Sequence, residues 1–394
     1  MKIAITHQGF IPHYRVRFFE LLNARSEHDY VVFHGEPPSG IGHHAAEGPF
    51  DFPNVNVTNH ELYIAGKSLI YQGVFRTIMR ERFNAVIMGT HVQFLSNHLV
   101  LLTFKTIGRP VLYWGHATEK TTGGNRVAMS LSRAAFHIKH RTIHLADGYL
   151  TYTKSGAKHL LDSGFDTDSV VAVGNTLDME MQVDLHRQMQ ALDEGLLREE
   201  LGLARDSVVF VYIGRIYAEK RVNDLTEAVR RILAERPEQP VEVVIIGDGP
   251  DAQRVREAAR GLPFVRFTGE LRDQAEVARY LRVASAVVIP GALGLAINHA
   301  LAHGLPVITR TSKFHAPEIE YLSPGRDSFI VDGEIEDFVA TLSTFVASPD
   351  LRSDMAHAAL LAREQLSLEA MVEAFDAGVS GLLQPAGSGS ARKL

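Results

Sequence analysis

Short runs of β-branched and aliphatic residues alternate with amphipathic stretches along almost the whole chain. A run such as Val208–Ile213 is followed by a segment with helical periodicity such as Val222–Glu235. Repeated strand–helix–strand units of this kind form parallel sheets with right-handed crossovers. The pattern therefore predicts an α/β protein with doubly wound parallel sheets. The expected strands are Lys2–Thr6, Tyr30–Phe33, Ala85–Met88, Val111–Trp114, Gly148–Thr151, Val170–Val173, Val208–Ile213, Val241–Ile246, Val265–Phe267, Ala286–Ile289, Val307–Thr309 and Ser328–Val331.

The length of the chain and a break in this pattern indicate two domains. With 394 residues the chain exceeds a typical single hydrophobic core. The alternation lapses over residues 178–206, most of which are polar and have helical periodicity. We therefore predict two Rossmann-like domains, residues 1–182 and 183–367. Their ligand cleft is expected at the carboxyl ends of the strands.

The C-terminal part of the chain follows a different pattern. Residues 368–385 have helical periodicity with no strand after them, so this helix is expected to pack back on the first domain. Residues 386–394 are rich in Gly and Ser and are expected to form a disordered tail.

Composition excludes several kinds of chemistry and location. The chain contains no Cys, which excludes disulfides, thiolate metal sites and Cys nucleophiles. Its first residues, MKIAITHQGF, do not form a signal peptide. No window reaches the roughly 18 apolar residues of a membrane span. These features predict a cytoplasmic protein, either free or peripheral at the inner face of the membrane.

A block of positive charge lies in the first domain. Residues 101–160 carry nine Lys and Arg against two acidic residues, Glu119 and Asp147. Basic side chains within residues 126–144 recur at helical spacing on one face. This face either docks on an anionic membrane surface or is simply solvated. The residues concerned are Arg126, Arg133, His137, His140, Arg141 and His144.

The second domain opens with a strand that ends in Gly214 and Arg215, with Lys220 at the entry to the next helix. Two cations and a helix N-terminus at one strand end suit a diphosphate. Two solvated loop charges are the alternative.

Glycines follow the next strands. Gly247, Gly249 and Ala252 fit the G-x-G-x-x-G/A pattern, but no ribose-binding acid stands about 20 residues on, so a dinucleotide-dependent oxidoreductase is not favoured. Gly291 and Gly294 lie between a strand and a helix, where backbone N–H groups can approach an anion.

Taken in order, these motifs resemble the retaining GT-B glycosyltransferases of family 4, and the resemblance covers nearly the whole chain. Gly214-Arg215 with Lys220 is similar to the family's diphosphate clamp, and Ile246–Pro250 to its I-G-x-G-P turn. Phe267–Gly269 is similar to its F-x-G motif, which places Gly269 near the donor. Gly174–Asp178 resembles the N-G-V-D segment that ends the first domain.

One departure concerns the two Glu residues, eight positions apart, that hold the donor in this family. Gly291 stands where the first Glu is expected and His299 where the second is expected. We expect that the backbone N–H groups of Leu293, Gly294 and Leu295 bind the donor instead, and that His299 donates to a ribose hydroxyl where Glu would accept. Glu318 follows the next strand and either enters the same cleft or is a charge at a helix start.

Two further positions are expected to face the cleft from the first domain. His116 follows the strand Val111–Trp114, and the resemblance implies that it contacts the transferred sugar; a core or surface His is the alternative. The loop after the first strand resembles the family's loop near the acceptor. Its candidate residues are Gly9, Phe10, His13 and Arg15.

The resemblance implies a hexosyltransferase-like enzyme. It would move a sugar from a nucleotide diphosphate sugar to a glycan, glycolipid or small-molecule hydroxyl, with retention, in bacterial surface polysaccharide or glycoconjugate synthesis. We expect no cofactor and no nucleic-acid partner. No metal is expected either, because two cations and a helix dipole can replace it and no Asp-x-Asp motif follows a strand. The alternatives are a catalytically inactive nucleotide-sugar-binding protein, suggested by the missing Glu pair, and a nucleotide-sugar epimerase of the same fold.

Overall fold

The computed structural model describes residues 1–6, 9–37, 45–64, 67–91, 93–117 and 141–384. The chain forms two compact units. The first comprises residues 1–175 and 369–394, and the second comprises residues 176–368.

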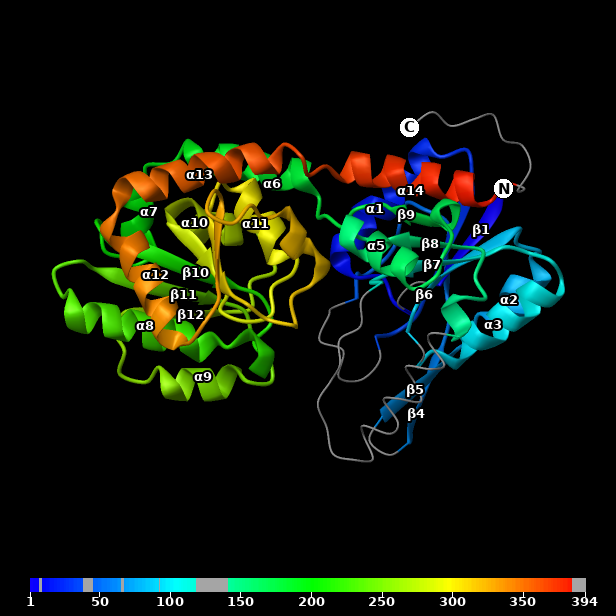
Figure 1. Cartoon of the computed structure of the whole chain (residues 1–394), viewed down its shortest axis with the longest axis horizontal. Helices are drawn as coiled ribbons and strands as arrows, with labels where there is room; N and C mark the ends of the chain where they lie inside the picture. Colours follow the sequence, from blue (N-terminus) through cyan, green and yellow to red (C-terminus); the bar gives the residue numbers. More distant parts are fainter. Residues whose placement is uncertain (7–8, 38–44, 65–66, 92, 118–140, 385–394) are drawn as a thin grey trace. The chain divides into compact units, whose positions relative to one another are not determined.

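The first unit is built on a seven-stranded parallel sheet with the order β3-β2-β1-β6-β7-β8-β9. A separate antiparallel hairpin, β4–β5, extends from it (Figure 1). The strands are β1 (Lys2–Thr6), β2 (Asp29–His34), β3 (Asn54–Asn56), β4 (Asn59–Ile64), β5 (Lys67–Gln72), β6 (Ala85–Gly89), β7 (Val111–Gly115), β8 (Gly148–Thr151) and β9 (Val170–Ala172).

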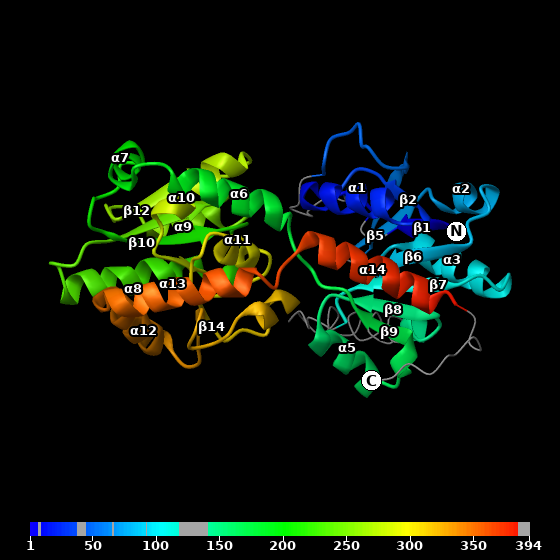
Figure 2. The same ribbon diagram turned by 90° about the horizontal axis from the view of Figure 1, so that it is seen from above.

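Helices cover both faces of this sheet. Its helices are α1 (Val16–Arg25), α2 (Phe75–Arg80), α3 (Leu95–Thr106), α5 (Lys154–Asp162) and α14 (Leu368–Leu382). On one face, Phe375 of α14 packs edge-on against Phe18 of α1 and Trp114 of β7, with ring centroids 5.3 and 4.8 Å away (Figures 1 and 2). On the other face, buried side chains of α2, α3 and α5 form a continuous apolar cluster with the strands. The C-terminal helix thus completes the core of the first unit.

The second unit contains a six-stranded parallel sheet with the order β12-β11-β10-β13-β14-β15. Its strands are β10 (Val208–Ile213), β11 (Val241–Ile246), β12 (Val265–Gly269), β13 (Ala286–Val288), β14 (Val307–Arg310) and β15 (Ser328–Val331). Its helices are α6 (Met179–Gln190), α7 (Glu194–Glu200), α8 (Val222–Glu235), α9 (Ala252–Ala258), α10 (Gln274–Val283), α11 (Ala296–Ala302), α12 (Ile335–Ala347) and α13 (Pro349–Arg363).

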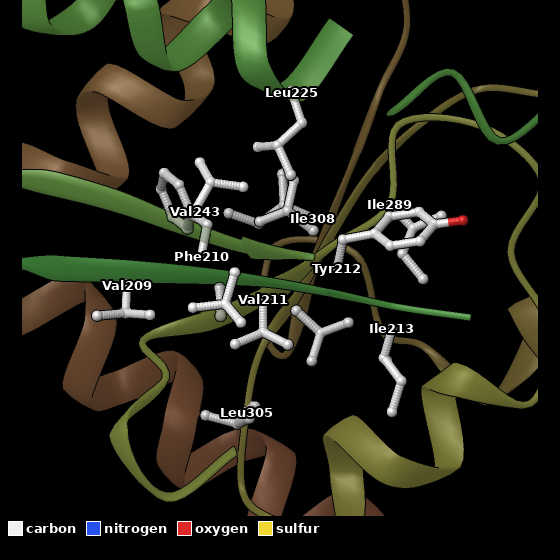
Figure 3. Close-up of a cluster of buried hydrophobic side chains, with 14 of the residues drawn as sticks. Val209, Phe210, Val211, Tyr212, Ile213, Leu225, Val243, Ile289, Leu305 and Ile308 are labelled. Atoms are coloured by element: carbon white, nitrogen blue, oxygen red, sulfur yellow. The ribbon is translucent and has the colours of Figure 1, made fainter. Parts of the chain in front are cut away.

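The core of the second unit explains why its strands read as unbroken apolar runs. Every residue of β10 is buried, and its side chains alternate between the two faces of the sheet. Figure 3 shows Phe210 and Tyr212 on the same side as Leu225 of α8, and Val209 and Val211 on the opposite side. Helices on both faces therefore bury the central strands completely.

The predicted α/β fold with parallel sheets is confirmed, and each predicted strand is present with ends shifted by at most two residues. Strand β3 and the β4–β5 hairpin were not predicted. Their sequences, NVN, NHELYI and KSLIYQ, lack long apolar runs because they lie at a sheet edge or outside the sheet.

The chain leaves the first unit after Asn175, earlier than the boundary expected at residue 182. Asp178 caps α6 by accepting a hydrogen bond from the N–H of Met181 at 2.9 Å. Gln182 of α6 then donates to Gln274 of α10 at 2.9 Å, which attaches this helix to the second unit. The polar stretch 178–200 contains two helices, α6 and α7.

Candidate functional site

The predicted clamp lies at the carboxyl edge of the second unit's sheet. Strands β10, β11, β13 and β14 are parallel, so the loops that follow them gather at one edge. Gly214 and Arg215 come directly after β10, and Lys220 ends the short 3-10 turn Ala218–Lys220. This is the edge at which open α/β sheets bind their ligands.

Both cations interact with Tyr217, which lies between them in the chain: Lys220 contacts its ring, and the charge of Arg215 affects the pKa of its hydroxyl. The Lys220 ammonium is buried, and it lies over the Tyr217 ring, 5.5 Å from the centroid. Burial raises the pKa of the Tyr217 hydroxyl, while the positive charge of Arg215 works in the opposite direction. The Arg215 guanidinium is exposed and makes no hydrogen bond or ion pair with the described residues. The structure therefore brings Arg215 and Lys220 to one loop, with Arg215 available for an anion.

The glycines of this edge are required because neighbouring loops stack backbone against backbone. A Cβ on Gly247 would lie 2.0 Å from the Gly214 carbonyl oxygen, and one on Gly249 would lie 2.2 Å from that of Ile216. The Gly247 N–H donates to the Gly269 carbonyl at 2.8 Å, which joins the ends of β11 and β12. These glycines hold the clamp loop in place.

Gly291 packs against the clamp loop in the same way. A Cβ there would lie 1.9 Å from the Glu219 carbonyl oxygen and 2.7 Å from the Lys220 carbonyl carbon. The next N–H, of Ala292, donates to that Glu219 oxygen at 2.7 Å. Gly291 aligns with a Glu of the family that the sequence resembles, but there is no room for any side chain at this position. Its close packing holds the backbone that carries Lys220.

The expected ligand contact of the Leu293 N–H is wrong. This N–H donates to Nδ1 of His315 at 3.2 Å, and Nε2 of the same ring lies 2.9 Å from the Arg310 carbonyl oxygen. The His315 ring thus bridges the Leu293 N–H and the Arg310 carbonyl. The N–H groups of Gly294 and Leu295, by contrast, have no hydrogen-bond partner among the described residues. Sequence reasoning missed His315, because its role depends on two loops that meet only in space.

Glu318 lies against the same loop. It belongs to the 3-10 turn Pro317–Tyr321, and only 1% of its surface is exposed. Its Oε2 lies 3.9 Å from where a Cβ on Gly294 would be, and the Ala316 side chain packs beside it. The structure therefore places a buried carboxylate near Gly294. Because Glu318 also follows Pro317 in the first turn of this helix, both predicted alternatives stay open.

His299 lies on α11, and part of its bonding capacity is used within the unit. Its Nδ1 lies 3.2 Å from Oε1 of Gln182 on α6. One turn further, His303 is buried, and its ring lies edge-on to His186 with centroids 5.5 Å apart. Burial lowers the pKa of His303 to about 3 and that of His186 to about 4, so both rings are neutral at pH 7. His299 therefore lies one turn before a pair of neutral histidines, of which His303 is buried and His186 is half-buried.

In the first unit, His116 lies at the carboxyl end of β7. Its ring is half-buried and packs edge-on against Tyr152, with centroids 4.8 Å apart. Its carbonyl oxygen accepts a hydrogen bond from the Tyr149 hydroxyl at 2.9 Å. Tyr152, which follows β8, thus holds the His116 ring at the carboxyl edge of the first sheet, where a ligand of this sheet is expected.

Three of the four expected acceptor-side residues are buried. Gly9 has φ +78°, and its carbonyl accepts from the side chains of Asn59 and Gln72 at 3.0 and 3.2 Å. Phe10 is only 6% exposed. His13 is exposed, so it is the member of this group whose side chain reaches the surface.

Arg15 lies in the core of the first unit instead of on a ligand-facing loop. Its guanidinium donates to Oδ1 of Asn175 and lies 3.5 Å from the Met371 sulfur. The rings of Trp114 and Tyr152 lie 5.3 and 5.7 Å from it. The chain leaves this unit after Asn175, and Met371 lies just after the chain returns to it. Arg15 therefore contacts both segments through which the chain passes between the two units.

Two other predictions concern segments that lie mostly or wholly outside the described residues. Most of the basic stretch 126–144 lies outside them; Arg141 and His144 are exposed, and the His144 ring stacks on Phe165. The tail 386–394 also lies outside them.

In the described part of the chain, no group of three His, Cys, Asp or Glu side chains is placed to hold a metal. No helix there is long and apolar enough to cross a membrane.

Sequence comparison relates the second unit to a known family. Residues 207–348 match the family of glycosyl transferases group 1. D-inositol 3-phosphate glycosyltransferase from Streptomyces scabiei is 27% identical over 282 residues, which cover 67% of this chain and 61% of the relative. The chain therefore spans about three fifths of the length of this curated relative.

Structural comparison extends over both units. HepE from Anabaena, solved in complex with UDP-glucose, has a TM-score of 0.67 and 14% identity, over 96% of this chain and 99% of that one. Sucrose-phosphate synthase from Thermosynechococcus elongatus has a TM-score of 0.69 and 15% identity, over 97% of this chain and 98% of that one. At such identities the likeness concerns the fold. The chain therefore has the GT-B fold of glycosyltransferases, and its residues 207–348 match the glycosyl transferases group 1 family.

Proposed function

We propose that this protein is a retaining glycosyltransferase that takes its sugar from a nucleotide diphosphate sugar. The acceptor in this proposal is a hydroxyl of a glycan, a glycolipid or a small molecule. The observation that carries the proposal is the pair Arg215 and Lys220, gathered at the carboxyl edge of the second sheet with the Arg215 guanidinium unpaired among the described residues. The family match over residues 207–348 and the UDP-glucose bound by the structurally similar HepE support this choice of donor.

The proposed reaction needs stabilisation of a leaving diphosphate. The acceptor hydroxyl attacks the anomeric carbon from the side on which the bond to the diphosphate breaks, and a phosphate oxygen takes the hydroxyl proton. The electron pair of the broken bond goes to the diphosphate, whose growing charge Arg215 and Lys220 stabilise through charge-assisted hydrogen bonds. The N–H groups of Gly294 and Leu295 lie in the loop that packs on the clamp and can serve the same ligand.

A ligand screen followed by product analysis tests the proposal. The full chain is mixed with a panel of nucleotide diphosphate sugars, and its melting temperature is measured. A ligand at about 100 times its Kd adds about 2.7 kcal/mol of stability. The best donor is then incubated with candidate acceptors, and proton NMR of the product reports the anomeric configuration.

Each outcome of that experiment has a distinct meaning. Transfer with the donor's own anomeric configuration supports the proposal, and an inverted product contradicts retention. A melting shift without turnover would identify a catalytically inactive nucleotide-sugar-binding protein. Conversion of the donor to its epimer in the absence of acceptor would identify an epimerase.

Glu318→Gln is expected to weaken binding of the donor sugar while leaving binding of the free nucleoside diphosphate nearly unchanged. Glu318 is buried beside Gly294, where its carboxylate can accept from sugar hydroxyls that lose water on binding. An unpaired buried polar group costs about 1–3 kcal/mol, so we expect the Kd of the donor to rise about tenfold. Calorimetric titration with both ligands measures the two changes.

The matched control is Glu320→Gln, an exposed acid on the same 3-10 turn. It should leave both Kd values unchanged. Equal losses of both ligands in Glu318→Gln would show that Glu318 supports the fold of the loop and does not contact the sugar.

His116→Ala is expected to lower kcat by about tenfold or more, with a smaller rise in KM. A contact that strengthens in the transition state affects kcat in this way. The His116 ring is held by Tyr152 at a strand end, so its removal leaves the surrounding β strands intact. Steady-state kinetics on a variant with the wild-type melting temperature makes the measurement, and an unchanged kcat would assign His116 a structural role.

A further inference from the structure

Arg221, the residue after Lys220, has a backbone conformation that arginine rarely adopts. Its φ is +55° and its ψ is +38°, in the left-handed region that favours Gly or Asn. Among the described residues, Arg82 is the only other residue besides Gly with a positive φ. Backbone strain of this kind persists only where the surrounding structure imposes it, and it is concentrated at functional sites.

The charge of Arg221 also lies at the unfavourable end of a helix. Arg221 is the N-cap residue of α8, and its side chain makes no capping hydrogen bond. The partial positive charge of a helix N-terminus favours acidic or short polar side chains at this position and repels a cation. An arginine here therefore raises the positive potential beside Lys220, at the carboxyl edge of the second sheet.

The ion pair that Arg221 makes is not needed to neutralise its partner. The Arg221 guanidinium lies 2.6 Å from Oδ2 of Asp224, in the first turn of α8. The same oxygen lies 2.6 Å from the guanidinium of Arg310, which is only 4% exposed and also donates to the Gly333 carbonyl at 2.7 Å. One carboxylate thus faces two guanidinium groups. If Arg221 turns away, Asp224 and Arg310 still pair, so no buried charge is left without a partner.

Acidic side chains on the neighbouring segment are engaged in other contacts. The start of α12 and the loop before it contain Asp332, Glu334, Glu336 and Asp337. Glu334 and Asp337 form the capping box of α12, and Glu336 pairs with Arg231 at 3.1 Å. Among the described residues, none of these four acids forms an ion pair with Arg221. The Arg221 side chain is 42% exposed, so a ligand can reach its guanidinium.

A leaving nucleoside diphosphate carries more charge than Arg215 and Lys220 neutralise. At pH 7 it has between about two and three negative charges, because a terminal phosphate has a pKa of about 6. The backbone that joins Lys220 to Arg221 is held against Gly291, where a Cβ would lie 2.7 Å from the Lys220 carbonyl carbon. A third cation on this backbone matches the charge that appears as the bond to the sugar breaks, and a guanidinium fork suits phosphate oxygens.

We propose that Arg221 is a third cationic binding residue of the diphosphate clamp, and that Asp224, together with Arg310, orients its guanidinium. Because this role requires a diphosphate ligand, it rests on the proposed function. On binding, the Arg221 guanidinium exchanges its contact with Asp224 for hydrogen bonds to phosphate oxygens, while Arg310 continues to neutralise Asp224.

Calorimetric titration of the full chain with UDP, GDP, ADP and inorganic pyrophosphate tests the proposal. Arg221→Gly removes the charge and suits the left-handed backbone, so its melting temperature should not fall. Its Kd should be about tenfold or more higher for each diphosphate that binds the wild type. Arg221→Asn, which also tolerates this backbone, should behave in the same way. Arg221→Lys keeps the charge but loses the fork, so its Kd should lie between the two.

The matched control is Arg82→Gly, because Arg82 is exposed, has φ +56° and precedes β6 at the amino edge of the first sheet. It should leave every Kd unchanged. The inference is overturned, with the proposed donor left standing, by an unchanged Kd in Arg221→Gly or by an equal rise in Arg82→Gly. It is also overturned if the Kd rises only in variants with a lowered melting temperature, because Arg221 would then support the fold of the loop.

The same titrations separate this inference from the proposed function. Absence of binding of every diphosphate to the wild type overturns both. A chain that binds a diphosphate through Arg221 but transfers no sugar supports the inference and contradicts only the proposed transfer.

Discussion

Arg215→Ala is expected to lower turnover by about 10²–10³, the effect of removing one preorganised donor from a developing anion. The Arg215 side chain is exposed and makes no ion pair among the described residues, so its loss removes no interaction that holds the loop. The free energy of unfolding should therefore change by no more than about 0.5 kcal/mol. Initial rates at saturating donor and a melting curve measure both quantities. Lys220→Ala should lower turnover as strongly, but with some loss of stability because Lys220 is buried.

The matched control is Arg230→Ala on the outer face of α8, where the arginine pairs with Glu227 at the surface. It should leave turnover unchanged. Wild-type rates in both Arg215→Ala and Lys220→Ala would show that the carboxyl edge of the second sheet is not where the diphosphate leaves.

Gly291→Ala is expected to destabilise the protein by about 2–4 kcal/mol and to abolish most of the activity. The added Cβ would lie 1.9 Å from the Glu219 carbonyl oxygen. The backbone fixes the position of a Cβ, and the carbonyl oxygen is itself a backbone atom, so no rotamer change relieves the overlap. Relief of this overlap displaces the loop that carries Lys220 and breaks the 2.7 Å hydrogen bond from Ala292 to Glu219. Thermal unfolding should show a drop of roughly 5–10 °C.

Gly73→Ala serves as the control for adding a methyl group at a glycine. Its Cβ would lie 3.5 Å from the nearest atom, the Thr58 carbonyl oxygen, which is ordinary contact. This variant should keep the wild-type melting temperature. A Gly291→Ala variant with unchanged stability and activity would show that the two loops are looser than the structure indicates.

The contact between position 291 and the Glu219 carbonyl also explains why this chain has Gly where the similar glycosyltransferases have Glu. Sequence alone presented Gly291 as a lost ligand-binding side chain. In the structure, a side chain there cannot coexist with the Glu219 carbonyl, so restoring Glu at this position would disrupt the clamp instead of repairing the site. The buried carboxylate beside Gly294 comes from Glu318, on a different loop.

The sequence by itself determined the fold class, the positions of the parallel strands other than β3, and the order of the loops that form the clamp. Buried parallel strands read as apolar runs because both of their faces are covered, and Gly214, Arg215 and Lys220 follow one such run directly. Only the tertiary structure decided which of the remaining residues can meet a ligand. Arg15 looked like a loop residue but is buried, and the Leu293 N–H is taken by His315 across two loops. Such pairings join residues far apart in the chain, so no local pattern of side chains specifies them, whereas strand periodicity is local and remains visible in the sequence.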